Sequence, residues 1–334
     1  MTSLLVGTRG SALATAQAGG VARRLGAAVG VEAELVRVTT HGDVSRASLS
    51  SLGGTGVFAA ALREALLDNE CDVVVHSMKD LPTASHPGLA VGAVPEREDA
   101  RDALCARDGL TLAQLPEGAR VGTGSPRRIA QLKHRRPDLE VVDIRGNVGT
   151  RLGFVDSGEL DAVVLAAAGL ARLELTERVT EYFDLVDWPT APAQGVLAVE
   201  VRSGDLETLE ADAPLHRALE AVHDIDADAV ASAERGVLAR LEAGCAAPVG
   251  AHAVISGDDL VVTARVYALD GSDMRTHSIT VGIGDVRPRE HAPGSATASD
   301  RARALRERAA RAGADLADAL LAAGAADIAP LRES

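Results

Sequence analysis

Short apolar runs rich in β-forming residues alternate with helical patterns through the first two-thirds of the chain, and this alternation limits the possible folds most strongly. Strands are expected at residues 4–7, 34–38, 72–76, 89–94, 120–122, 141–144, 161–165 and 196–201. Helices are expected between them, at residues 12–25, 59–67, 127–134 and 148–156. Strands and helices that alternate in this way predict an α/β architecture with mixed, mostly parallel sheets.

Two turn-rich segments divide this α/β region. Residues 95–119 are charged and rich in turn formers, and residues 187–195 (DWPTAPAQG) suggest a second crossing between lobes. The remainder, with a helix at 227–242, three strand-like runs and a closing helix at 301–323, predicts a smaller α+β domain. We therefore expect domain 1 at residues 1–97 and 193–218, domain 2 at residues 98–192, and domain 3 at residues 219–334, a division that 334 residues can support.

The composition favours a cytoplasmic protein. No apolar run approaches the roughly 18–20 residues that span a bilayer, and the N-terminus lacks the basic and apolar regions of an export signal. Cys71, Cys105 and Cys245 are widely spaced and form no CxxC pair, so we predict neither a disulfide framework nor a metal site.

Charge is distributed unevenly along the chain. The net charge of −14 disfavours a general nucleic-acid binder or a protein that binds acidic membranes. Residues 120–151, however, carry eight basic and three acidic side chains. A basic segment in an acidic protein indicates a focused site for an anion.

Three predicted strand–loop–helix junctions combine an arginine with the start of a helix, where unpaired N–H groups favour anions. The first contains Gly7 and Gly10, which permit close backbone approach, together with Arg9 and the expected helix cap Ser11. Each junction could also be an ordinary turn with surface arginines, but three similar junctions favour anion binding.

The other two junctions lie inside the basic segment. In one, Ser125 is expected to cap a helix whose first turn holds Arg127 and Arg128, although arginines there oppose the helix dipole. In the other, Arg145 and Arg151 flank a helix start that Asn147 can cap. None of the three matches a nucleotide-binding loop, so small carboxylated ligands are the expected class.

Two further segments contain candidate reactive groups. Lys79 and Asp80 follow an apolar strand, at the end where α/β proteins bind ligands, although an Asp–Lys pair that closes a turn is the plainer interpretation. Cys245 follows a helix that Gly244 can terminate, and small neighbours leave its sulfur accessible, although an accessible cysteine is ordinarily a free thiol. Cys71 and Cys105 lie in apolar contexts and are expected in the core.

Nine segments in the same order resemble the porphobilinogen deaminase family, also called the hydroxymethylbilane synthases, and together they span about three-quarters of the chain. They are GTRGSALATAQ (7–17), THGD (40–43), GGTGVF (53–58), VVVHSMKDLP (73–82), GTGSPRRIAQL (122–132), IRGNVGTRL (144–152), AAAGLARL (166–173), APAQG (191–195) and LEAGCAAPVG (241–250).

The resemblance implies two lobes similar to periplasmic binding proteins, a third domain that carries the cysteine, and a transferase of tetrapyrrole (haem and corrin) biosynthesis. Four porphobilinogen molecules lose ammonia and are joined head to tail into hydroxymethylbilane, on a dipyrromethane cofactor that a thioether attaches to Cys245. Because porphobilinogen carries acetate and propionate groups, the growing chain requires many cations.

The resemblance also implies roles for individual residues. Asp80 would be catalytic, stabilising the positive charge that develops on the pyrrole nitrogen and transferring protons. The expected cofactor-binding residues are Cys245, Lys79, Ser125, Arg127 and Arg128. The expected residues for substrate and growing chain are Arg9, Ser11, Arg145, Arg151 and Arg172.

One alternative keeps the two lobes but not the chemistry: a non-catalytic binding protein for a small carboxylated ligand. It predicts no covalent group on Cys245 and no requirement for Asp80. A nucleic-acid binder that uses residues 120–151 is disfavoured by the net charge and by the lack of interleaved aromatic residues. The family resemblance implies a monomer whose partner is porphobilinogen, and the composition and net charge predict no membrane or nucleic-acid partners.

Overall fold

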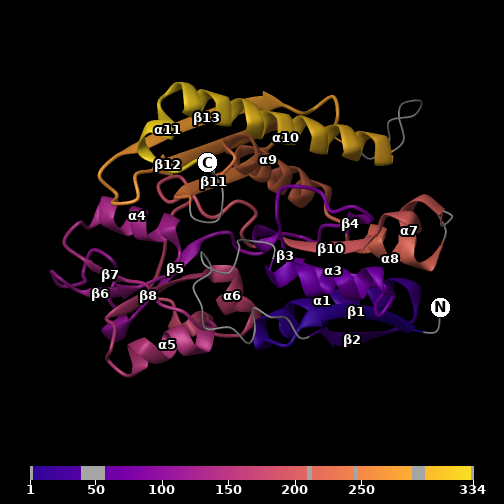
Figure 1. Cartoon of the computed structure of the whole chain (residues 1–334), viewed down its shortest axis with the longest axis horizontal. Coiled ribbons are helices and arrows are strands. Elements are labelled where there is room, and N and C mark those ends of the chain that lie inside the picture. The colour runs from indigo at the N-terminus through magenta and orange to yellow at the C-terminus, as the bar shows by residue number, and fades with distance from the viewer. Residues whose placement is uncertain (1–2, 39–56, 209–212, 244–246, 288–297, 332–334) are drawn as a thin grey trace. The chain divides into compact units, whose positions relative to one another are not determined.

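A computed structural model describes residues 3–38, 57–208, 213–243, 247–287 and 298–331 (Figure 1). Its α/β class and mixed sheets confirm the predicted fold class. The contacts divide the chain into two compact units. Unit 1 comprises Met1–Glu98, Ala171–Glu174 and Gly195–Ala227, and unit 2 comprises Asp99–Leu170, Leu175–Gln194 and Asp228–Ser334. The boundaries of the three expected domains stay a prediction.

Unit 1 is built on a five-stranded sheet with the order β2-β1-β3-β10-β4. Among the described residues, β1 pairs in parallel with β2 and β3, whereas β10 runs antiparallel to both β3 and β4. Its elements are β1 (Ser3–Arg9), α1 (Ala12–Val29), β2 (Glu32–Val38), α3 (Val57–Leu67), β3 (Val73–Ser77), the 3₁₀ helix η1 (Met78–Asp80), β4 (Leu89–Ala93), β10 (Leu197–Arg202), α7 (Ser203–Thr208) and α8 (Pro214–Val222).

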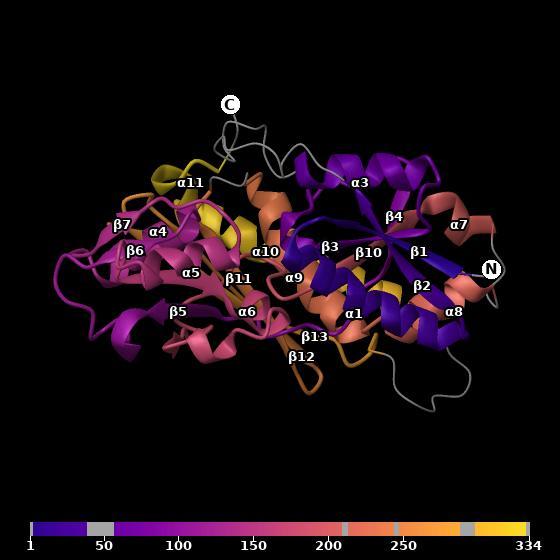
Figure 2. The same ribbon diagram turned by 90° about the horizontal axis from the view of Figure 1, so that it is seen from below.

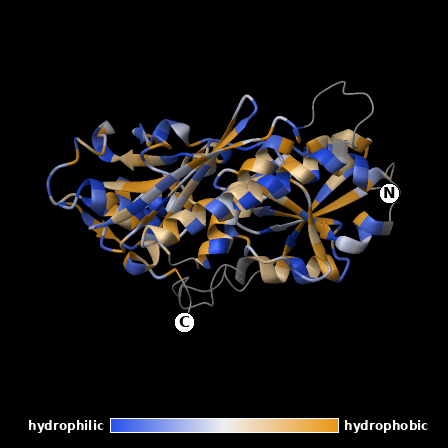
Figure 3. Ribbon diagram, turned by 90° about the horizontal axis from the view of Figure 1, so that it is seen from above, coloured by the Kyte–Doolittle hydropathy of each residue, from blue (hydrophilic) through white to orange (hydrophobic). Residues whose placement is uncertain are grey.

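Helices cover both faces of this sheet. Leu25 of α1 and Leu219 of α8 pack with Val73 and Val199 on one face, and Leu66 of α3 packs with Val74 on the other. Figure 2 shows α3 on the side of the strands opposite to α1 and α8. Because both faces are buried, the inner strands β1, β3 and β10 are apolar runs rather than alternating patterns, and strands of the sheet are largely hydrophobic in Figure 3.

A buried ion cluster crosses the core of unit 1. Glu200 of β10 is 3% exposed and accepts hydrogen bonds from Arg63 Nη2 at 2.8 Å and Nε at 3.0 Å. His76 Nε2 of β3 lies 3.2 Å from the same carboxylate. Burial opposes ionisation, but His76 and Arg63 hold the pKa of Glu200 at about 2. No pattern in the sequence predicts this cluster.

Unit 2 contains a five-stranded sheet with the order β7-β6-β8-β5-β9, in which β6 pairs in parallel with β7 and β8 while β5 is antiparallel to β8 and β9. Helix α4 packs on one face through Leu132, and α5 packs on the other through Leu152. The elements are β5 (Asp102–Ala106), η2 (Arg107–Gly109), β6 (Arg120–Gly122), α4 (Pro126–Arg135), β7 (Glu140–Val142), α5 (Val148–Asp156), β8 (Ala162–Ala166), α6 (Ala167–Arg172), η3 (Thr176–Arg178) and β9 (Glu181–Tyr182).

The rest of unit 2 is the expected α+β region. An antiparallel sheet of three strands packs with α10, and α9 crosses α10 where Gly236 and Gly313 leave no space for side chains. The elements are α9 (Ile225–Leu241), β11 (Val249–Ser256), β12 (Asp259–Tyr267), β13 (Met274–Gly282), α10 (Ala298–Ala322) and α11 (Ala325–Ile328). None of the helices in the described ranges is both long and apolar enough to cross a membrane.

Candidate anion-binding and catalytic site

Four predicted site residues gather at one edge of the sheet in unit 1. Arg9 ends β1, Ser11 follows it, and Lys79 and Asp80 lie in η1 directly after β3. Because β1 and β3 are parallel neighbours, their carboxyl ends meet at this edge. This is where α/β proteins place ligands. The edge therefore carries two cationic side chains and one hydroxyl, together with the carboxylate of Asp80.

The backbone around Asp80 is anchored while its side chain is exposed. Met78 and Leu81, on either side, are 4% and 5% exposed, and Leu81 N donates to Met78 O at 3.1 Å. Asp80 itself is exposed and Lys79 is half-buried. An acid on a fixed turn that remains open to ligands is suited to proton transfer.

At the first junction, the structure confirms the predicted cap Ser11 but gives Gly7 a different role from the one expected. Ser11 caps α1, accepting a hydrogen bond from Ala14 N at 3.2 Å, as predicted. Gly7 was expected to let a ligand approach the backbone. A Cβ there would lie 2.7 Å from Val74 Cγ1 and 2.9 Å from Cys71 Sγ, so this glycine makes room for packing within unit 1.

Arg172, at the end of α6, also belongs to unit 1. It is half-buried and donates from Nη2 to Gly195 O at 2.8 Å. Burial lowers its pKa, and nearby Glu98 partly offsets that effect. Gly195 has a φ of 88°, and a Cβ there would collide with Glu98 O, so only glycine fits beneath this arginine.

The second junction begins α4 in unit 2. Ser125 occupies the N-cap position and Pro126 the first turn, as predicted, but the Ser125 side chain makes no capping hydrogen bond. Its hydroxyl is therefore not committed to the helix. A Cβ on Gly124 would lie 2.7 Å from Ile144 O, so this glycine permits close contact with the chain segment that leads to Arg145.

A buried carboxylate that was not predicted from the sequence is hydrogen-bonded to the two arginines of this junction. Asp102, at the start of β5, is 0% exposed and accepts hydrogen bonds from four side chains. The donors are Arg127 Nη1 at 2.8 Å, Arg128 Nη2 at 2.6 Å, Trp188 Nε1 at 2.9 Å and Gln194 Nε2 at 2.8 Å. Burial opposes ionisation of Asp102, but the two arginines hold its pKa well below its usual range.

Arg127 and Arg128 therefore already face one protein anion. They are 3% and 6% exposed, and Arg127 Nη1 also donates to Gln131 Oε1 at 2.6 Å. Each nevertheless keeps a buried Nε that has no hydrogen-bond partner among the described residues. Unsatisfied buried donors are costly, and two of them beside the Ser125 turn fit a ligand with several carboxylates.

The third junction adds further positive charge. Asn147 caps α5 as predicted, accepting from Thr150 N at 2.9 Å. Arg151 donates from Nε to Gly146 O at 2.9 Å, whereas Arg145 makes a 3.3 Å contact with Asp143. Burial, together with repulsion from Arg128 and Arg145, lowers the pKa of Arg151 to about 10. Mutual repulsion of three arginines indicates a site that an anion would stabilise.

The structure thus brings together Arg9, Ser11, Lys79 and Asp80 in unit 1, and Ser125, Arg127, Arg128, Arg145 and Arg151 in unit 2. Cys245 and the segments 40–43 and 53–56 lie outside the described residues. One feature of the sequence points indirectly to Asp102. Two arginines in the first turn of a helix oppose the helix dipole, so a negative charge is expected near them.

The chain is similar in sequence to known proteins over most of its length. Residues 4–210 match the family described as "Porphobilinogen deaminase, dipyromethane cofactor binding domain", and residues 229–292 match "Porphobilinogen deaminase, C-terminal domain". The porphobilinogen deaminase of Leifsonia xyli subsp. xyli is 56% identical over 332 residues, covering 99% of this chain and 95% of that protein. The porphobilinogen deaminase of Corynebacterium glutamicum is 55% identical, covering 83% and 89%.

Solved structures give a more distant likeness. A periplasmic substrate-binding protein of an ABC transporter from Coxiella burnetii aligns with a TM-score of 0.43 and 14% identity, covering 66% of this chain and 92% of that one.

Proposed function

The chain belongs to the porphobilinogen deaminase family, and on that basis we propose how its described residues divide the work of the reaction. The enzyme is a transferase of tetrapyrrole biosynthesis that deaminates four porphobilinogen molecules and condenses them head to tail into hydroxymethylbilane. The family's dipyrromethane cofactor supplies the pyrrole on which the chain grows.

The surplus of positive charge formed by Arg128, Arg145 and Arg151 carries the proposal. Burial is the main cause of the lowered pKa of Arg151, and repulsion by Arg128 and Arg145 adds to it, so carboxylates that pair with these guanidinium groups would recover free energy. We assign Ser125, Arg127 and Arg128 to the cofactor carboxylates. The basis is the uncommitted Ser125 hydroxyl and the buried donors of the two arginines, with Asp102 fixing both guanidinium groups. Arg145 and Arg151 would then hold carboxylates of the substrate and growing chain.

Unit 1 supplies the acid and further cations. Asp80 would accept and return protons as ammonia leaves and pyrroles couple, and its charge would stabilise the positive charge that develops on the pyrrole nitrogen. Lys79 would pair with a cofactor carboxylate. Arg9, Ser11 and Arg172 would orient substrate and growing chain, Arg172 from a position that Gly195 fixes.

We further propose that the enzyme acts as a cytoplasmic monomer without membrane or nucleic-acid partners. The two described cysteines, Cys71 and Cys105, are buried free thiols, as predicted, which suits a reducing compartment. No observation favours a non-catalytic binding protein, and the anchor residue provides the test that separates the two functions.

We expect the purified protein to have an intact mass above that of the bare chain by one dipyrromethane, and Cys245→Ala to have the mass of the bare chain and no activity. Cys105→Ala, which removes a buried thiol, is the matched control and should keep the added group. An active wild-type protein with no added mass would refute the proposed function, and an added group retained in Cys245→Ala would refute the anchor.

For Arg151→Gln we expect the KM for porphobilinogen to rise about 10- to 100-fold, with a smaller change in kcat, because one charge-assisted hydrogen bond to a carboxylate is lost. Steady-state kinetics of the holoenzyme measure this. Arg178→Gln is the control, since Arg178 of η3 pairs with Asp156 of α5 on the protein at 2.5 Å. Equal KM values for the two variants would remove Arg151 from the substrate site.

A further inference from the structure

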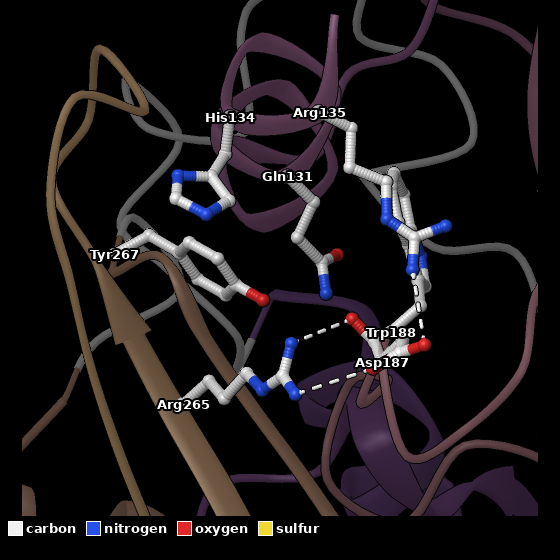
Figure 4. Close-up of a pocket in the computed structure, with 7 residues that line it drawn as sticks. All are labelled: Gln131, His134, Arg135, Asp187, Trp188, Arg265 and Tyr267. Atoms are coloured by element: carbon white, nitrogen blue, oxygen red, sulfur yellow. Dashed lines mark hydrogen bonds and ion pairs between the residues drawn. The ribbon is translucent and has the colours of Figure 1, made fainter. Parts of the chain in front are cut away.

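A polar pocket lies entirely within unit 2, between the end of α4, the segment around Trp188, and β12. Its cavity volume is about 360 Å³, within the range of pockets that bind small molecules (Figure 4). None of the site residues predicted from the sequence is among the described residues that line it. The reaction proposed above leaves this pocket without a role.

Hydrogen-bond donors face the pocket. Figure 4 shows the Tyr267 hydroxyl, the Gln131 amide and the Arg265 guanidinium pointing toward the same space. The Tyr267 ring is 1% exposed, and its hydroxyl makes no hydrogen bond to the other residues labelled in Figure 4. Gln131 Nε2 donates one N–H to Pro189 O at 2.9 Å, which leaves its other N–H for a ligand. Arg265 Nε is buried and lacks a partner among the described residues.

Positive charge exceeds negative charge around these donors. Arg135 and Arg265 line the pocket with one acid, Asp187, whose side chain is 67% exposed. The two ion pairs of Asp187 are long, at 3.9 Å to Arg135 and 3.7 Å to Arg265, so it neutralises them weakly. Arg265 is held in place by hydrogen bonds to Asp187 O at 2.8 Å and Val186 O at 2.9 Å.

His134 adds a further ring nitrogen. Its Nδ1 lies 2.9 Å from Gly271 O, and because a carbonyl only accepts, Nδ1 carries the hydrogen. The ring meets Tyr267 edge-on, with 5.9 Å between centroids. Both side chains are thereby fixed, and ordering them on ligand binding costs little entropy.

We propose that this pocket binds a small oxyanion, either a carboxylate or a phosphate, through Arg135, Arg265 and the Tyr267 hydroxyl. Fixed donors without partners, a net positive charge and a confined volume are the properties that such an anion requires.

The pocket is also one hydrogen bond away from the Asp102 cluster. Gln131 accepts from Arg127, and Trp188 donates to Asp102, so two of its lining residues hold that cluster in place. An anion bound in the pocket would therefore affect the position of Arg127 through its hydrogen bond to Gln131. This link rests on the proposed function of Arg127, whereas the anion site itself does not depend on it.

Trp188 makes the test direct, because it is the one tryptophan in the sequence and Arg135 lies 5.4 Å from its ring centroid. The holoenzyme is titrated with inorganic phosphate and, separately, with succinate, at constant ionic strength. Tryptophan emission then localises binding and calorimetry measures Kd. We expect saturable binding of at least one anion. Its Kd should rise about tenfold in Arg135→Gln and about fivefold in Tyr267→Phe, since each change removes one hydrogen bond to an anion.

Lys133→Gln, which removes the same charge from the same helix outside the pocket lining, is the matched control and should leave Kd unchanged. Binding of phosphate alone would identify a phosphate site, and binding of succinate alone a carboxylate site. Absence of saturable binding by both anions, or an unchanged Kd in both Arg135→Gln and Tyr267→Phe, would overturn the proposal. Neither result depends on the added mass on Cys245, so failure here is distinct from failure of the proposed function.

Discussion

Asp80→Asn is expected to slow turnover by at least about a hundredfold, while the fold and the attached cofactor are retained. The amide keeps the size of the side chain but can neither accept a proton nor stabilise a developing positive charge. General acid–base catalysis and electrostatic catalysis each accelerate the reaction, and the variant loses both. Because Asp80 is exposed on a turn anchored by Met78 and Leu81, the substitution should barely affect stability. Single-turnover kinetics with porphobilinogen, alongside intact mass, measure both effects.

Asp68→Asn supplies the control, since it makes the same chemical change at another exposed position of unit 1. It should turn over at the wild-type rate. If Asp80→Asn also retained near-normal turnover, Asp80 would have no catalytic role, and the plainer interpretation of a polar turn residue would stand.

Asp102→Asn is expected to destabilise unit 2 by about 3–5 kcal/mol, because it leaves two buried arginines without their counter-charge. The sign of the pH dependence follows from the lowered pKa of Asp102. The contribution of Asp102 to the free energy of unfolding is complete above the pKa that this carboxyl has in the unfolded chain. It is lost only as the pH falls through the lower pKa that Asp102 has in the folded protein. The stability difference between wild type and variant should therefore persist from neutral to mildly acidic pH in urea unfolding.

Asp138→Asn is the matched control, because Asp138 pairs with Arg136 at an exposed site and should contribute little. A second variant separates charge from packing. Adding Arg128→Met to Asp102→Asn removes one of the two uncompensated charges and should recover part of the lost stability. An Asp102→Asn protein as stable as wild type would show that the cluster is not a counter-charge for the arginines.

The repeating elements could be predicted because their signals are local. Apolar runs predicted eight strands of the α/β region to within a few residues, and the N-caps Ser11, Ser125 and Asn147 were placed correctly. Strand β5 was missed because the acidic and basic residues before it resemble a surface turn. Its first residue, Asp102, is buried only because partners more than 20 residues away neutralise it.

The same long-range pairing limited the prediction of the site. Arg127 and Arg128 were expected to face a bound anion directly, whereas the structure gives both of them Asp102 as a neighbour. No local pattern distinguishes an arginine that faces a ligand from one that faces its own protein. The Arg63–Glu200–His76 cluster was missed for the same reason, since Glu200 lies more than 100 residues from Arg63 and His76 in the sequence.

The place of β10 between β3 and β4 also bears on how the protein is made. A ribosome produces β4 more than 100 residues before Leu197, yet β4 has no strand neighbour other than β10 among the described residues. Val199 and Val201 complete the apolar core beneath α1 and α8. Unit 1 therefore cannot finish its sheet during early synthesis, and the nascent chain must keep β4 unpaired until most of the sheet in unit 2 has already emerged.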